Sequence, residues 1–254
     1  MPLFRLEGYV LKTQPLGDAD KIVTFLTREE GKIRGVAKSA RRSRRRFGSS
    51  LEPWSRVALS LFEKEATDLT RVESCDLLES SYRLQEDLET GFFLSYMAEV
   101  ADLFSRDRQA EPHYYRLLGS VLGALRSGLS RATAQRYFEV WTLKLHGLLP
   151  DLARCSDCDE ELSRGRFIFQ PGSGSVLCPR CGASGGGLQV VLGEPGREVL
   201  GAVLRKHPLD LVAHPLSTAG LAEVGRMTAA SLAAFVETPF RAARFLEVAE
   251  GRPS

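Results

Sequence analysis

The first 80 residues alternate between apolar and polar positions with a period of two, which is typical of short β-strands. This alternation predicts strands over residues 6–11, 21–27, 32–37, 56–62 and 69–78. Between the first two strands, Pro15 and Gly17 favour a turn, and residues 29–31 suit a tight hairpin. Five short strands in this length predict a small barrel of the OB type. An SH3-like barrel would give nearly the same pattern.

From residue 82 the apolar positions change to helical spacing. A stripe at four-residue steps predicts the first helix: Leu84, Leu88, Phe92, Tyr96, Val100 and Phe104. Further helices are predicted from Pro112, over 131–149, and over about 195–206, 218–236 and 239–249, with Ser217 and Thr238 as N-caps. Each of the last three is too short to bury its apolar stripe alone. We therefore expect them to pack on the 82–150 bundle.

Together these elements predict an α+β protein with two domains. The first, residues 1–80, is the small β-barrel of the OB type. The second, residues 81–254, is all-α and carries an inserted four-cysteine module at 153–184. Hydrophobic residues make up 43% of the 254 residues, which is enough for packed cores in both domains.

Charge is distributed unevenly along the chain. The net charge is only +2, yet residues 32–46 contain eight cationic side chains and no acidic one. They are Lys32, Arg34, Lys38, Arg41, Arg42, Arg44, Arg45 and Arg46. The run begins as the end of a strand and is expected to continue as a flexible cationic loop. Such a loop suits a polyanion, because each neutralised phosphate releases counterions. The alternative is a solvated basic tract without a partner.

The cysteines form the strongest local motif. Cys155-x-x-Cys158 and Cys178-x-x-Cys181 are separated by 19 residues that include a β-like Phe167-Ile168-Phe169. Two such knuckles place four sulfurs for tetrahedral coordination, which predicts a closed, structural Zn²⁺ site of the zinc-ribbon kind. Paired disulfides and an iron–sulfur site are the alternatives, and both fit less well. The fifth cysteine, Cys75, is expected to be a small buried hydrophobe.

Motifs for catalysis, export and membrane insertion are missing from the sequence. It contains no phosphate-binding GxxxxGK[ST] loop, no HExxH, no GxSxG and no carboxylate cluster typical of a two-metal nuclease. No apolar stretch reaches the length of a membrane span, and charges interrupt the apolar start of the chain. We therefore expect a cytoplasmic binding protein that is not an enzyme.

The order of these parts resembles the RecO family of bacterial recombination mediators. The likeness is most specific near the N-terminus, where EGYVLK at 7–12 and PLGDADKIVT at 15–24 are similar to the family's first hairpin. TREEGKIRGVAK at 27–38, leading into arginines, is similar to its next segment. PFRAARFL at 239–246 resembles its last helix. Not every member keeps the zinc cysteines, whereas this chain has all four.

The resemblance implies a DNA repair protein of the RecF recombination pathway. Members of the family bind single- and double-stranded DNA and anneal complementary strands. With RecR and the single-stranded-DNA-binding protein as partners, they help to load the RecA recombinase onto coated strands, without cofactor turnover. The eight cations of 32–46 lie in the matching barrel segment, so the resemblance implies DNA contact there. It adds Lys12 as a further DNA-binding candidate, and it implies a cytoplasmic location at the nucleoid.

Two other classes of function are compatible with the same sequence. The first is an RNA-binding zinc-ribbon protein of the translation or transcription apparatus, which would use the same barrel and loop. The second is a nucleic-acid enzyme with an unrecognised acidic site. Annealing of complementary strands would separate the first from a mediator, and incubation of DNA with magnesium or manganese would reveal the second.

Overall fold

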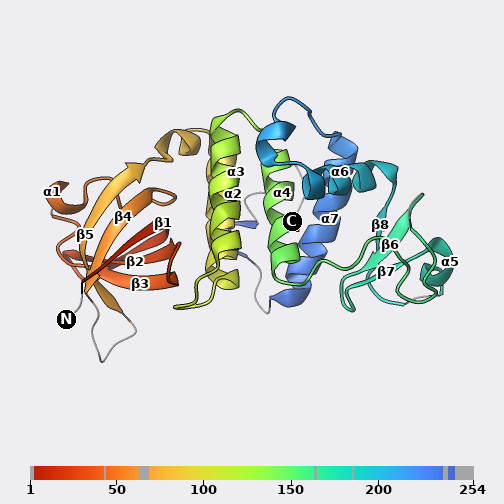
Figure 1. Ribbon diagram of the computed structural model, residues 1–254, viewed down its shortest axis with the longest axis horizontal. Coiled ribbons are helices and arrows are strands. Elements are labelled where there is room, and N and C mark those ends of the chain that lie inside the picture. The colour runs from red at the N-terminus through yellow and green to blue at the C-terminus, as the bar shows by residue number, and fades with distance from the viewer. Residues whose placement is uncertain are drawn as a thin grey trace. The chain divides into compact units, whose positions relative to one another are not determined.

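A computed structural model of the chain describes residues 3–42, 44–62, 69–162, 165–184, 186–236 and 240–243 (Figure 1). The described residues form two compact units: 3–116 with 240–243, and 117–236. The predicted boundary at 80 marks the change from strands to helices. The compact units divide elsewhere, because the first helices pack closely on the barrel.

The N-terminal strands form a closed barrel in the order β1-β2-β3-β5-β4. Its strands are β1 (Leu3–Leu16), β2 (Asp20–Thr27), β3 (Gly31–Ala37), β4 (Arg56–Phe62) and β5 (Thr70–Glu79). The long strand β1 pairs first with β4 and then, across a bulge after Val10, with β2. The parallel pairing of β3 with β5 closes the barrel. The predicted five-stranded barrel of the OB type is confirmed.

Alternation along the strands fills the interior of the barrel. Strand β4 alternates strictly, and Val57, Leu59 and Leu61 are almost fully buried. Phe25 and Ile33 meet them from β2 and β3. Cys75 lies in the same core, as expected, where burial raises the pKa of its thiol to about 11.

The cationic run, predicted as a loop, contains a short helix that the sequence pattern did not indicate. After a turn at 38–42, the chain forms the short helix α1 (Arg44–Phe47). Phe47 is only 3% exposed and packs in the barrel core together with Leu51, and Ala40 packs against the same core. The pattern missed this anchor because one phenylalanine follows ten residues without a large apolar side chain.

Helices pack against the outside of the barrel within the first unit. After the 3-10 helix η1 (Tyr82–Gln85) come α2 (Leu88–Phe104) and the start of α3 (Pro112–Arg126). The buried Trp54 indole donates a hydrogen bond to the Leu94 carbonyl of α2 at 2.8 Å. The Tyr115 hydroxyl on α3 donates to the Glu7 carboxylate of β1 at 3.0 Å.

The stripe predicted for the first helix is only partly correct. Tyr96, Val100 and Phe104 are buried as expected, whereas Leu88 is 69% exposed and Phe93 takes the place of Phe92 in the core. The physical reason is geometric. An α-helix turns about 100° per residue, so strict four-residue steps drift by about 40° each and leave the buried face within a few turns.

The second unit is built from helices and the cysteine module. The helices are α4 (Arg131–Leu145), α6 (Glu194–Arg205), the 3-10 helix η2 (Pro208–Leu211) and α7 (Thr218–Phe235), and α3 continues into it from residue 117. Helices α6 and α7 pack on each other and on α4, as predicted for the C-terminal helices. Ser217 caps α7 through the Gly220 amide at 3.2 Å. The predicted cap Thr238 and most of the predicted helix 239–249 lie outside the described residues.

Buried polar contacts fix the pairing of these helices. The Glu139 carboxylate of α4 is 2% exposed and accepts from Gln135 at 3.0 Å and from Thr228 of α7 at 2.5 Å. It also pairs with Arg136 at 3.2 Å. From α7, Glu223 accepts hydrogen bonds from the Gly193 and Gly196 amides and so caps the N-terminus of α6.

A small sheet with the strand order β7-β6-β8 carries the cysteine module. It consists of β6 (Phe167–Gln170), β7 (Ser175–Leu177) and β8 (Val190–Leu192), and the short helix α5 (Pro179–Gly182) follows β7. The predicted β segment at Phe167 is confirmed as the central strand. Strand β8 lies beyond the predicted end of the module at 184. No helix in the described ranges has the length and apolarity that crossing a bilayer requires.

Candidate metal centre and nucleic-acid interface

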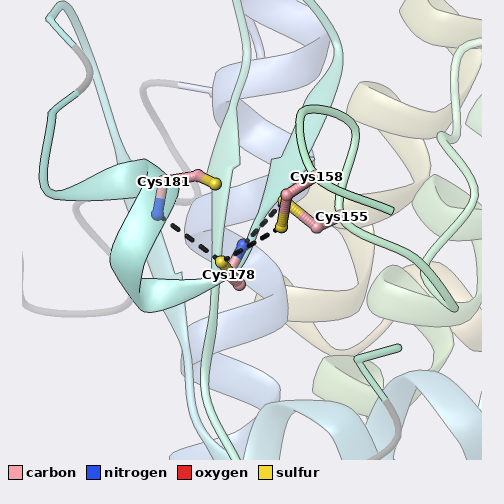
Figure 2. Close-up of side chains that lie close together, drawn as sticks. All are labelled: Cys155, Cys158, Cys178 and Cys181. Carbon is pink, nitrogen blue, oxygen red and sulfur yellow. Dashed lines mark hydrogen bonds between the residues drawn. The ribbon is translucent and has the colours of Figure 1, made fainter. Parts of the chain in front are cut away.

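The four cysteines converge from two separate segments. Figure 2 shows Cys155 and Cys158 on one loop, facing Cys178 and Cys181 at the start of α5. The Ser156 amide donates to the Val176 carbonyl at 2.7 Å, and the Ser156 hydroxyl accepts from the Val176 amide at 3.0 Å. These two bonds clamp the first knuckle onto β7, directly before the second knuckle.

Distances between the sulfurs fit one small cation. All four Sγ atoms lie within 4.8 Å of one another, and those of Cys158 and Cys178 are 3.8 Å apart. Tetrahedral coordination with zinc–sulfur bonds of about 2.3 Å requires sulfurs about 3.8 Å apart. All five cysteines are free, so these four are available as ligands. The arrangement can hold a metal ion, and a four-sulfur donor set is one of those that structural zinc sites use.

Hydrogen bonds to the cluster sulfurs shift the pKa values of two of the four thiols. The Cys178 amide donates to the Cys155 sulfur at 3.3 Å, and the Cys181 amide donates to the Cys178 sulfur at 3.5 Å. Burial acts to raise the pKa of Cys155, but backbone amides outweigh it and lower that pKa to about 6. Hydrogen bonds with Cys158 and Cys178 raise the pKa of Cys181 to about 12. Metal binding would therefore displace at least one proton.

An arginine next to the cluster was not foreseen from the sequence. The Arg180 guanidinium donates to the Cys158 sulfur at 3.7 Å and pairs with Glu160 at 3.6 Å. Its positive charge partly compensates the net charge of −2 that Zn²⁺ with four thiolates would carry. Arg180 lies between two cysteines of one knuckle, so its position in the motif could have suggested this contact.

The cationic segment, residues 38–46, lies beside the β1–β2 hairpin. The Arg41 amide donates to the Ala19 carbonyl at 3.0 Å, and the Arg41 side chain donates to the Gly17 carbonyl at 3.2 Å. The Ser39 amide donates to Asp20 at 2.8 Å, which holds the turn against the same hairpin. The Arg46 guanidinium lies 4.9 Å from the centre of the Phe47 ring.

The structure brings most of the predicted DNA-binding cations to this region. Lys38, Arg41, Arg42 and Arg46 are exposed, and none of them forms an ion pair with a carboxylate among the described residues. Arg44 and Arg45 belong to α1, but their side chains lie outside the described part of the structure. Contact of these residues with DNA stays a prediction.

Two further candidates occupy the outer face of the barrel. Lys12 on β1 and Arg34 on β3 are exposed. Both lie opposite Thr24 of β2, the strand between them. They therefore form one cross-strand row, about 10 Å apart at a strand spacing of about 4.8 Å. Lys12 also lines a cavity of about 280 Å³ between the barrel and α2.

Lys32 differs from the other cations. It is 8% exposed, and its ammonium group donates to the Asp102 carbonyl at 2.6 Å. The same group pairs with the carboxylates of Asp102 at 3.2 Å and Asp107 at 3.5 Å. The structure thus places Lys32 in the contact between barrel and α2 and does not favour it as a DNA contact. Its partners lie some 70 residues away in the sequence, beyond the reach of a local pattern.

A pocket in the second unit was also not foreseen. Its volume is about 580 Å³, and Lys144, Arg197 and Arg205 bring three cationic side chains to its lining. Leu152, Leu162, Phe167, Leu200 and Leu204 contribute apolar surface beside them. The lining residues come from α4, β6, α6 and the loops between them, so sequence spacing gave no signal for the pocket.

Comparison with known proteins gives a consistent result over nearly the whole chain. Residues 1–81 match the family model described as Recombination protein O N terminal, and residues 85–243 match Recombination protein O C terminal. The chain is similar to the DNA repair protein RecO of Koribacter versatilis, with 42% identity over 68% of this chain and 70% of that protein. It is 35% identical to that of Anaeromyxobacter sp. (strain Fw109-5), over 92% and 90% of the two chains. For Symbiobacterium thermophilum the identity is 34%, over 97% and 98%.

Proposed function

This chain belongs to the RecO family of DNA repair proteins, and from that premise we propose that it is a recombination mediator without catalytic activity. It binds single- and double-stranded DNA and anneals complementary strands in the RecF pathway. With RecR as its partner, it helps to load the RecA recombinase onto single strands that the single-stranded-DNA-binding protein has coated. It acts in the cytoplasm, at the nucleoid.

The observation that carries this proposal is the anchored cationic segment on an OB-type barrel. Phe47 and Ala40 pack with the barrel core, so the segment's described cations, Lys38, Arg41, Arg42 and Arg46, lie next to the barrel. Cations concentrated in this way screen the repulsion between two strands and leave the bases available for pairing. We assign DNA contact to Lys12, Arg34, Lys38, Arg41, Arg42, Arg44, Arg45 and Arg46, and omit Lys32 because its ammonium group is already paired.

The metal is proposed to be structural Zn²⁺, held by Cys155, Cys158, Cys178 and Cys181. Four thiolates fill a tetrahedral shell, so no open position remains for an activated water. The cation would fasten the two knuckles to the small sheet, which has only three short strands. Its contribution is thus to the fold of the module.

The pocket of the second unit supports a contact with the coating protein. An acidic peptide tail would place its carboxylates near Lys144, Arg197 and Arg205 and its apolar side chains against the leucines and Phe167. We propose this pocket as the binding site of the coating protein's acidic tail. Its affinity for such a peptide should fall with increasing salt, because Lys144 and Arg205 are exposed and salt screens exposed charges.

The decisive experiment is the annealing of complementary DNA strands coated with the cognate single-stranded-DNA-binding protein, with and without this chain. We expect faster annealing in its presence, and intact strands after incubation with magnesium or manganese. Unchanged annealing would contradict the mediator function. Cleaved DNA would reveal an enzyme. Annealing of complementary RNA strands but not of DNA strands would favour the RNA-binding alternative.

A further inference from the structure

Barrels that bind single strands usually stack the bases on exposed aromatic rings. The first 81 residues of this chain contain six aromatic side chains, and all six lie in described parts of the structure. They are Phe4, Tyr9, Phe25, Phe47, Trp54 and Phe62. Four of them are buried, with exposed fractions of 5% for Tyr9, 0% for Phe25, 3% for Phe47 and 1% for Trp54.

Each buried ring is committed to the fold. Phe25 and Phe47 fill the barrel core. Tyr9 lies against Tyr115 with ring centres 5.0 Å apart, and Trp54 donates its indole hydrogen bond to α2. Turning any of these rings towards a base would open a large cavity and break a packed contact, which costs several kcal/mol. They are therefore not available for stacking.

Exposed rings lie elsewhere in the first unit. Phe4 is 40% exposed at the start of β1, whereas the cationic segment contacts the hairpin at the other end of that strand. The two ends are twelve residues apart along β1 and lie on opposite sides of the bulge after Val10. Tyr82 is 65% exposed in η1, beyond the end of β5. Phe62 is half-buried and pairs with Leu3 near the same end as Phe4.

The segment itself offers charge without a ring. Lys38, Arg41, Arg42 and Arg46 present their cationic groups to solvent. The one ring of the segment's helix, Phe47, is turned into the core beneath Arg46. Long cationic side chains reach phosphates on any strand, because phosphates repeat along the backbone irrespective of base or sugar.

From this separation of charge and rings we infer that the barrel holds nucleic acid by its phosphates alone, reading neither base nor sugar. The inference rests on the proposed DNA-binding function and specifies its chemistry. Two consequences follow. A strand without bases binds as tightly as an ordinary one, and single-stranded RNA binds as tightly as DNA, so the protein also anneals RNA to complementary DNA.

The test compares three oligonucleotides of equal length and charge with the full-length, metal-loaded protein, using fluorescence anisotropy. They are a mixed-sequence DNA strand, the same backbone with abasic tetrahydrofuran units, and an unstructured RNA of the same sequence. We expect dissociation constants within about threefold of one another and the same salt dependence for all three. Stacking would instead weaken abasic binding by roughly 5- to 150-fold for each base lost.

Two variants test whether an exposed aromatic ring contacts the bases. Phe4→Ala and Tyr82→Ala remove the two most exposed rings among the described residues of the first unit, and we expect both to bind all three strands with unchanged affinity. A tenfold loss on the abasic strand, or a tenfold loss caused by either variant, would show that bases are stacked and overturn the inference. A tenfold difference between RNA and DNA would show that the sugar is read. Absence of binding to every strand would instead refute the proposed DNA-binding function itself, and the inference with it.

Discussion

The cationic segment of the barrel and the cysteine module both carry arginines, but they use them differently. In the module, Arg154 pairs with Asp159 at 2.8 Å and Arg180 pairs with Glu160 at 3.6 Å. On the barrel, Lys38, Arg41, Arg42 and Arg46 contact at most backbone carbonyls and an aromatic ring, and no carboxylate among the described residues. A cation beside a carboxylate stabilises its own surroundings, whereas a cation without one can still bind a phosphate. The number of positive charges in a segment is therefore a weaker indication of phosphate binding than the presence or absence of carboxylates beside them.

Removal of the metal should have the largest effect, and it should be confined to the module. We expect about one equivalent of zinc in protein purified without chelator, measured by mass spectrometry. Chelation, or Cys155→Ser with Cys178→Ser, should expose residues 153–192 to proteolysis, because metal binding supplies about 10–16 kcal/mol in comparable sites. The barrel should keep its affinity for DNA within about threefold. Reduced, folded protein without metal would contradict the site.

Removal of cations from the cationic segment should weaken DNA binding and leave the fold intact. In wild type, phosphate contacts by the five arginines at 41, 42 and 44–46 should contribute about −3.5 to the slope of log affinity against log salt concentration on single strands. Changing Arg41, Arg42, Arg44, Arg45 and Arg46 to alanine should flatten this slope and weaken binding by about three orders of magnitude at 0.1 M salt. Annealing should slow, and the melting temperature should stay within a few degrees. An unchanged slope would show that the segment does not contact DNA.

Lys32 and Arg34 lie two residues apart on one strand, and they should differ in the same way. Lys32 should stabilise the fold, whereas Arg34 should bind DNA. Lys32→Ala should lower the free energy of unfolding by about 1–3 kcal/mol, because it leaves Asp102 without its buried partner, although both carboxylates are partly solvated. Its salt dependence of DNA binding should not change. Arg34→Ala should leave stability unchanged and reduce the slope by about 0.7.

Urea unfolding and salt titrations on both variants would measure these effects. Lys32→Met, which keeps the aliphatic stem, separates loss of packing from loss of charge. Equal reductions of the slope in Lys32→Ala and Arg34→Ala would refute the distinct role that we assign to Lys32.

Arg180 should show the smallest effect. Arg180→Ala should speed the transfer of zinc to a colorimetric chelator by less than about tenfold, because the side chain is 78% exposed and water screens its charge. Arg154→Ala is the matched control, since Arg154 pairs with Asp159 and not with a cysteine. Identical transfer rates in wild type and both variants would mean that Arg180 does not influence the metal.

Much of the fold could be predicted because its signals are local. Alternation along β4 gave its buried positions, the CxxC spacing gave the cluster of four sulfurs, and Ser217 identified the start of α7. Burial was wrongly predicted for Leu88, because the buried face depends on the exact rotation per residue along the helix. Burial of Phe47 was missed, because it depends on core residues that are distant in the sequence. The short helix α1 in the predicted loop was missed for the second reason.

The sequence by itself determined the barrel, the helical remainder and the four cysteines that cluster, since periodicity and cysteine spacing act over a few residues. Only the tertiary structure decided which positive charges remain available. Lys32 is paired with the carboxylates of Asp102 on α2 and Asp107 in the loop after it. Five other cations of the run are exposed: Arg34, Lys38, Arg41, Arg42 and Arg46. Electrostatic pairing acts through space between distant parts of the chain, so no pattern along the sequence could have separated these cations.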